Sequence, residues 1–199
     1  MNHMRLTSPS LIVVSSREGK LAKIQDFIVQ DLASRCKDPR AAATHTYTLI
    51  ARAPDSPAAQ ALQAVLADVT AANISVRVVV LETEPMAEDV IPASLLDLSS
   101  ADVRLLQDQR FADAHEQLWL GNARVWIGDC MRRDPAKRDA FEVFHTSDAK
   151  AAVHAEASFA KLRAAAKPMT RLAPAALAPE VIHAGQSTDA SNGHTPVRN

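Results

Sequence analysis

The segment VRVVVLE at residues 76–82 is an almost continuous apolar run, and it constrains the fold more than any other part of the chain. Such a valine-rich run is typical of a strand buried on both faces, as in the parallel sheets of α/β proteins. Two further runs fit the same pattern: SLIVV at residues 10–14, and HTYTLIAR at residues 45–52. The second of these is rich in Thr, Tyr and Ile, which favour strands. The sequence therefore predicts a sheet with long connections between its strands.

Helical patterns occupy these connections. The first helix is expected to end near Cys36, with Asp26 and Asp31 on the side away from the core. In the second, Ser56 is the expected N-cap and Pro57 the first helical residue. The core-facing stripes contain Leu21, Ile24, Phe27, Ile28 and Leu32 in the first helix, and Leu62, Val65, Leu66 and Val69 in the second. This order of elements predicts an α/β fold with a mixed, largely parallel sheet and helices on both faces.

The second half of the chain adds strands and a closing helix. A helix is expected from about residue 100 to residue 110, and a β-hairpin over residues 115–127 that turns at Gly121-Asn122. Residues 140–144 (AFEVF) predict one more strand, and residues 147–166 predict a helix. For this last helix we expect Ser147 as the cap and Val153, Phe159 and Leu162 among the inward residues.

The composition predicts one folded domain with flexible ends. A chain of 199 residues with 47% hydrophobic residues can bury one substantial core, which we assign to residues 10–167. Residues 1–9 are expected to form a flexible N-terminus. Residues 168–199 are rich in Ala, Pro and Ser without periodicity, and we expect them to be a flexible tail.

Charge and cysteine content exclude several classes of protein. A net charge of −1 without a dominant basic block does not predict non-specific nucleic-acid binding. Two cysteines, Cys36 and Cys130, are too few for a disulfide scaffold and fit a reducing cytoplasm. No segment approaches the roughly 20 apolar residues of a membrane helix. The spacing of Cys130, His145 and His154 matches no zinc signature, so we expect no metal and no cofactor.

Residues 115–131, HEQLWLGNARVWIGDCM, carry the main functional signal. This segment resembles the active-site hairpin of the phospholipase D superfamily, which runs His-x-Lys-x4-Asp, a strand, and then Gly-Ser-x-Asn. His115 stands at the His position and Gly128 at the glycine, and Glu142 in the next strand matches an acidic residue of the family. The remaining positions differ: Gln117 replaces Lys, Asn122 replaces Asp, and Asp129 and Met131 stand where Ser and Asn would be. The turn is one residue shorter than usual, so Gly121 is an alternative match for the Asp.

The resemblance implies phosphodiester transfer through a phosphohistidine, with one His as nucleophile and a second, from another copy of the motif, as acid. Chains with one motif generally dimerise, so a homodimer is expected. His115 would act from each subunit, and Glu142 would orient it. Gln117 brings no positive charge to a phosphate, and Asp129 would repel one. Since one lost donor typically costs a factor of about 100 to 1,000 in rate, the altered positions count against family-type activity.

Several residues have two interpretations that the sequence leaves open. His115 is either a site residue or a structural residue bonded to Glu142 or to backbone. Arg132 and Arg133 either supply new donors to an anionic or phosphate-containing ligand or belong to a solvated loop of mixed charge. Trp119 and Trp126 either stack on a ligand or belong to the core or a dimer interface.

Three functional hypotheses follow from these observations. The first is a catalytically degenerate phospholipase D-like protein that acts as a binding or scaffold module, as a homodimer. Its site would contain His115 and Glu142, with Gln117, Asn122, Gly128, Asp129, Arg132 and Arg133 as ligand-binding residues. The alternative is a dimeric phosphodiesterase, of nuclease or phospholipase type, that uses His115 from each subunit. The third is an α/β domain whose tail recruits a partner.

Overall fold

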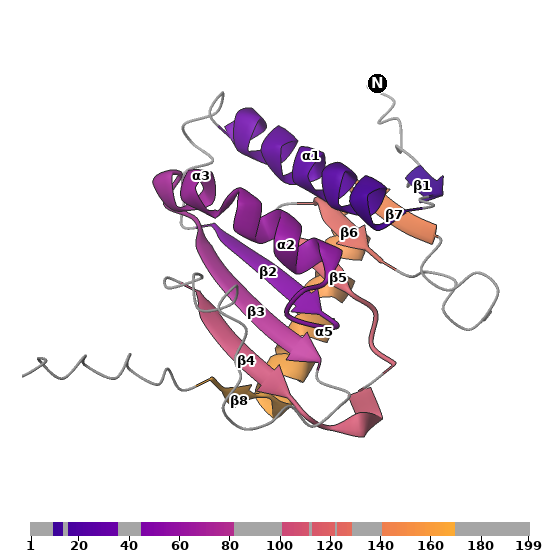
Figure 1. Cartoon of the computed structure of the whole chain (residues 1–199), viewed down its shortest axis with the longest axis vertical. Coiled ribbons are helices and arrows are strands. Elements are labelled where there is room, and N and C mark those ends of the chain that lie inside the picture. Colours follow the sequence, from indigo (N-terminus) through magenta and orange to yellow (C-terminus); the bar gives the residue numbers. More distant parts are fainter. Residues whose placement is uncertain are drawn as a thin grey trace, which may run out of the picture. The chain divides into compact units, whose positions relative to one another are not determined.

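The computed structural model describes residues 10–13, 16–35, 45–81, 101–111, 113–121, 123–128 and 141–169. Figure 1 shows their arrangement. The strands are β1 (Ser10–Val13), β2 (Thr46–Ala51), β3 (Ser75–Leu81), β4 (Asp102–Leu106), β5 (Gln117–Trp119), β6 (Val125–Ile127), β7 (Phe141–His145) and β8 (Lys167–Pro168). The helices are α1 (Arg17–Arg35), α2 (Pro57–Ala64), α3 (Leu66–Ala71), α5 (Ala149–Ala165) and the 3-10 turn η2 (Gln109–Phe111).

The described strands form one mixed sheet in the order β1-β7-β6-β5-β2-β3-β4-β8. β2, β3 and β4 are parallel neighbours, with Leu49 opposite Val78 and Val78 opposite Val103. The neighbouring pairs β1–β7, β7–β6, β6–β5, β5–β2 and β4–β8 are antiparallel. The mixed α/β sheet is thus confirmed, but its parallel part is limited to β2–β4. The reason is that β1 pairs with β7 at the edge and not with a strand of the parallel group.

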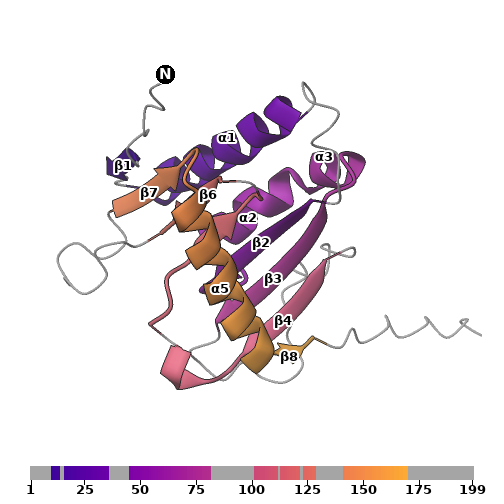
Figure 2. The same ribbon diagram turned by 180° about the vertical axis from the view of Figure 1, so that it is seen from behind.

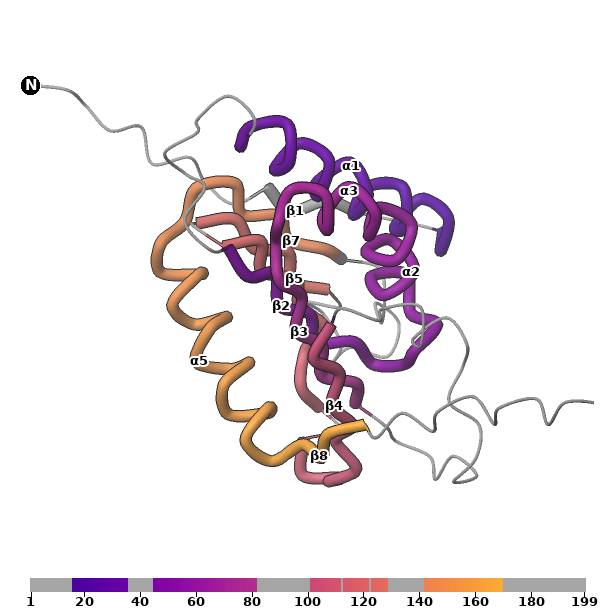
Figure 3. The backbone as a smooth tube through the Cα atoms, turned by 90° about the vertical axis from the view of Figure 1, so that its left-hand side faces the viewer, coloured from indigo at the N-terminus to yellow at the C-terminus, as the bar shows by residue number. Residues whose placement is uncertain are grey.

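Helices cover both faces of the sheet, as predicted. α1, α2 and α3 lie on one face and α5 on the other, which Figures 1 and 2 show from the front and from behind and Figure 3 from the side. Strand β2 contributes to both cores: Leu49 packs with the helices α1 and α2, whereas Ile50 packs with α5. The α1–α2 side contains the larger cluster, with Ile24, Tyr47, Leu62, Leu118, Trp126 and Phe144 among its buried members.

Two helix starts show how local sequence sets the elements. Ser56 is the N-cap of α2 and Pro57 is its first residue, as predicted. The Ser56 hydroxyl accepts a hydrogen bond from the Ala59 amide at 3.4 Å. The cap of α5 is Asp148 and not Ser147, because the Asp148 carboxylate accepts from two amides of the first turn, each at 3.0 Å. A carboxylate at this position also interacts favourably with the helix dipole.

Other expectations were wrong. Residues 102–106 form strand β4 and not a helix, since pairing with β3 buries Leu106 and overrides the weak helical pattern. Val153, expected to face inward, is 65% exposed, whereas Phe159 and Leu162 are buried as predicted. Asp31, expected on the solvent side of α1, is 1% exposed because it has buried polar partners.

Residues 1–9 and 170–199 lie outside the described residues, as do Cys36 and Cys130, so the predictions made for them stay predictions. The chain divides into residues 1–169 and 170–199, and the described residues all belong to the first unit. No helix among the described residues is long and apolar enough to cross a membrane.

Candidate functional site

His115 lies in the segment between η2 and β5, and its side chain is exposed at a pocket on the α5 face of the sheet. The pocket has a volume of about 560 Å³. Its apolar lining includes Ile50 from β2 and Leu162 from α5. Its polar lining consists of His115, Gln117, His145, Asp148, Lys150, His154 and Ser158. Three histidines, one before β5, one at the end of β7 and one in α5, therefore share one pocket.

Gln117, the first residue of β5, makes a buried structural contact. Its side chain is 6% exposed, and its Nε2 donates to the carbonyl oxygen of Ala155 in α5 at 2.8 Å. The amide thus ties the sheet to the helix that covers this face. A lysine at position 117 would place a strongly hydrated ammonium against the same helix. Gln117 is therefore a structural contact in this chain.

Gly128, Glu116 and Glu142 lie next to one another near the ends of β5, β6 and β7. The Gly128 amide donates to the Glu116 carbonyl oxygen at 2.9 Å. A Cβ at position 128 would lie 2.7 Å from the Trp126 ring and 3.3 Å from Glu142 Oε2. Glycine is therefore required here because the ring and the carboxylate occupy the space that any side chain would need.

Glu142 is 0% exposed and forms an ion pair with Lys20 of α1, with 2.7 Å between Nζ and Oε1. Burial raises the pKa of Glu142, and the Lys20 ammonium opposes this shift. The nearby Glu116 raises it further, and Glu116 itself accepts a hydrogen bond from the Arg52 amide at 3.0 Å. A buried carboxylate without Lys20 would be strongly disfavoured in its charged form.

Glu142, predicted to orient His115, lies on the other face of the sheet from that histidine. Glu142 pairs with α1, whereas His115 and Gln117 line the pocket on the α5 side, the opposite face of the sheet. A different carboxylate contacts a pocket histidine: Asp148 Oδ2 lies 3.2 Å from His145 Nδ1. Hydrogen bonds from the α5 amides, Ala151 first, hold the pKa of Asp148 below its usual value, so this carboxylate is ionised at neutral pH.

The remaining predicted site residues divide into two groups. Asn122, Asp129, Arg132 and Arg133 lie outside the described residues. Trp126 is fully buried in the α1-side core, whereas Trp119 is partly buried on the α5 side. The two tryptophans therefore cannot stack on one ligand. Among the described residues, no group of three His, Cys, Asp or Glu side chains is placed to hold a metal ion.

The pairing of Lys20 with Glu142 and the contact of Glu116 with the Arg52 amide were not predicted from the sequence. Lys20 lies one turn before Ile24 on the apolar side of α1, and a lysine within such a stripe is the signal that could have indicated a buried partner. Glu116 was passed over because the motif assigns no role to the residue between its His and Lys positions. Neither residue could be matched to Glu142 from local sequence, since the contacts join distant segments.

No protein-family model and no curated protein sequence matches the chain. The fold is similar to Nuc from Salmonella typhimurium, a phospholipase D family member (TM-score 0.50, 16% identity, 82% of this chain and 100% of that chain). It is also similar to NucT from Helicobacter pylori (TM-score 0.51, 15% identity, 81% of this chain and 99% of that chain).

A third structure of similar fold is TrmBL2, an archaeal chromatin protein with a novel mode of DNA binding (TM-score 0.55, 11% identity). The match covers 82% of this chain and 56% of the TrmBL2 chain, so this chain spans little more than half of that protein. At these identities the likeness concerns the fold and not the chemistry. The mixed sheet with helices on both faces is thus a phospholipase D-like α/β fold.

Proposed function

We propose that the chain is a catalytically degenerate phospholipase D-like protein that acts as a binding or scaffold module, as a homodimer. The observation that carries this proposal is the buried hydrogen bond from Gln117 Nε2 to the Ala155 carbonyl oxygen at 2.8 Å. One of the two Nε2 donors is thus committed to a helix carbonyl, and the neutral amide brings no positive charge to a phosphoryl oxygen. The position that supplies a phosphate-binding lysine in the family thus serves packing in this chain.

The ion pair between Lys20 and Glu142 supports the same conclusion. A carboxylate that orients a catalytic histidine must contact the imidazole and stabilise its charged form. Here the carboxylate of Glu142 faces the Lys20 ammonium inside the core and is not among the residues that line the pocket of His115. Glu142, the acidic residue matched to the motif, therefore has a structural role in this chain.

One observation favours the alternative, a dimeric phosphodiesterase that uses His115 from each subunit. The His115 side chain is exposed and lines a pocket with His145 and His154, so an imidazole is accessible to a phosphate diester. This alternative lacks a described cation at the position of the family's lysine. The basic residues that would replace it, Arg132 and Arg133, lie outside the described residues.

The ligand that fits the proposal is an anionic or phosphate-containing group, which Arg132 and Arg133 would contact. The proposed homodimer is tested by the molar mass in solution from light scattering, for which the account predicts twice the chain mass. A monomer at micromolar concentration would contradict the dimer without bearing on the loss of catalysis. The cytoplasm is the proposed compartment, on the basis of the low cysteine content.

Substitution of Gln117 tests the central observation. Gln117→Leu keeps the side-chain volume but removes the donor, and it should lower the free energy of unfolding by about 1–3 kcal/mol. Gln109→Leu is the matched control because Gln109 is exposed, and it should leave stability unchanged. The reversion Gln117→Lys should create no diesterase turnover. A Gln117→Leu variant as stable as wild type would contradict the structural role of this side chain. Turnover in Gln117→Lys would contradict the proposed loss of catalysis.

A further inference from the structure

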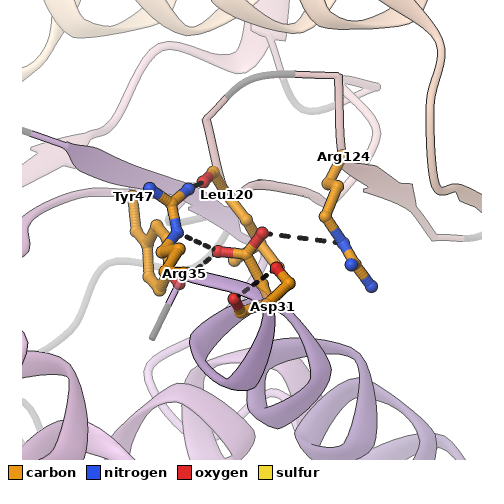
Figure 4. Close-up of polar contacts among 6 residues, drawn as sticks. Asp31, Arg35, Tyr47, Leu120 and Arg124 are labelled. Carbon is orange, nitrogen blue, oxygen red and sulfur yellow. Dashed lines mark hydrogen bonds and ion pairs between the residues drawn. The ribbon is translucent and has the colours of Figure 1, made fainter. Parts of the chain in front are cut away.

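A buried polar cluster lies at the far end of β5 from His115, where α1 ends (Figure 4). Its centre is the carboxylate of Asp31. Arg35 Nε donates to Asp31 Oδ2 at 2.5 Å, and the Tyr47 hydroxyl donates to the same oxygen at 2.6 Å. Arg124 Nε lies 3.6 Å from the other oxygen, Oδ1. Arg35 also donates through Nη2 to the carbonyl oxygen of Leu120.

The cluster carries more positive than negative charge. Arg35 and Arg124 are both charged at any physiological pH, and among the described residues Asp31 is the carboxylate that contacts them. Tyr47 stays neutral, because burial and its hydrogen bond to Asp31 raise the pKa of the phenol. His45 is neutral at pH 7, since burial first and then Arg35 lower its pKa. The described cluster therefore has one uncompensated positive charge.

Two buried nitrogens here, Arg35 Nη1 and His45 Nε2, have no hydrogen-bond partner. Arg124 Nε also lacks one, because Asp31 Oδ1, with which it forms an ion pair, is 3.6 Å away. The Arg35 side chain is 10% exposed, so water does not fully solvate its guanidinium. Leaving a buried donor unsatisfied costs about 1–3 kcal/mol, and more for a charged group. An acceptor that bears negative charge would remove both the orphaned donors and the excess charge.

The cluster is also held in a fixed geometry. Arg124 lies over the Phe27 ring at 5.0 Å, and Arg35 lies over the Tyr47 ring at 5.5 Å, so each guanidinium has one face covered by an aromatic ring. Gly121 has φ +79°, and a Cβ there would lie 3.2 Å from Arg35 Nη2 and 3.9 Å from His45 Nδ1, so both side chains approach the same point. In Figure 4 the outer nitrogens of Arg124 point away from Asp31. With 17% of its side chain exposed, Arg124 is the more accessible of the two arginines.

We infer that Arg35, Arg124 and His45 form a binding site for a small oxyanion, a phosphate or carboxylate group. The guanidinium forks supply charge-assisted hydrogen bonds of the kind that such anions accept. Asp31 orients both arginines and is not itself a ligand. This site is separate from the pocket of His115, which lies on the α5 face, and it does not rest on the proposed loss of catalysis.

Thermal unfolding of the full chain tests the site. The probe is sodium phosphate, compared at pH 7 with sodium chloride of equal ionic strength. Phosphate at about ten times its dissociation constant should raise the folded-to-unfolded ratio roughly tenfold and raise the melting temperature accordingly. Arg124→Met keeps packing on Phe27 but removes the charge, and it should abolish the increase. Arg110→Met is the matched control, because Arg110 is exposed and pairs with Asp108 at the surface.

Sodium acetate in the same assay distinguishes the two sources of an oxyanion: an increase with phosphate alone assigns a phosphate group, and an equal increase with acetate assigns a carboxylate. If Arg124→Met does not fold, Arg124→Lys replaces it. This variant keeps the charge beside Asp31 but loses the fork, and it should weaken phosphate binding about tenfold or more. No increase over chloride in wild type, or an equal increase in the Arg124 variants, would overturn the proposal.

Discussion

Replacing Asp31 by asparagine keeps the shape of the side chain and removes the charge at the centre of the buried cluster. Arg35 and Arg124 would then lose their carboxylate partner inside the protein. Removing one partner of a buried ion pair costs about 3–5 kcal/mol, because the remaining charge stays uncompensated. Typical domains have a free energy of unfolding of roughly 5–15 kcal/mol, so Asp31→Asn should remove a large fraction of the total.

Urea denaturation in phosphate-free buffer measures this loss. With a slope of about 2 kcal/mol per molar urea, a loss of about 4 kcal/mol moves the midpoint down by roughly 2 M. Tyr47→Phe removes a single hydrogen bond to the charged Asp31 and should cost less, about 1.5–3 kcal/mol. Asp108→Asn, at an exposed ion pair, is the control and should leave the midpoint unchanged. If Asp31→Asn unfolded at the wild-type midpoint, the reasoning about the buried charge would be refuted.

Two further predictions concern the contacts around Glu142. Gly128→Ala should destabilise the fold by about 1–3 kcal/mol in urea denaturation, because the added Cβ would lie 2.7 Å from the Trp126 ring; an unchanged midpoint would show that the ring yields freely. Burial raises the pKa of Glu142, so its contribution to stability is complete below the ordinary value of 4.5 and is lost as the pH rises through the raised value. The stability of wild type minus that of Glu142→Gln should therefore fall from about pH 4.5 towards pH 7, and a difference that grows with pH would contradict this sign.

Local patterns were sufficient to predict a large part of the fold. The valine-rich run became β3, and the Ser56-Pro57 signal became the start of α2, because each depends on residues close in sequence. Strand β4 was not predicted, since its pairing with β3 is a tertiary contact that overrides local preference. The antiparallel position of β1 beside β7 was equally inaccessible to local sequence, because it joins the two ends of the domain.

The candidate site was predicted less completely than the fold. The hairpin motif identified the segment that contains His115 and the pocket, but not His145 and His154 as neighbours of that histidine. Asp26 and Asp31 were assigned to the side away from the core, because buried charges are rare without partners. Arg35 lies on α1 itself, but Tyr47 and Arg124, which also contact Asp31, and Glu142, which pairs with Lys20, come from other elements and cannot be identified from local sequence.

We propose that the hairpin has the fold contacts but not the chemistry of a phosphodiesterase. This is tested by turnover of a chromogenic phosphate diester by wild type and by His115→Ala, with circular dichroism to confirm that both are folded. We expect no turnover above the buffer rate for either protein. Turnover by wild type that is lost in His115→Ala would contradict it, and would identify His115 as a reacting residue.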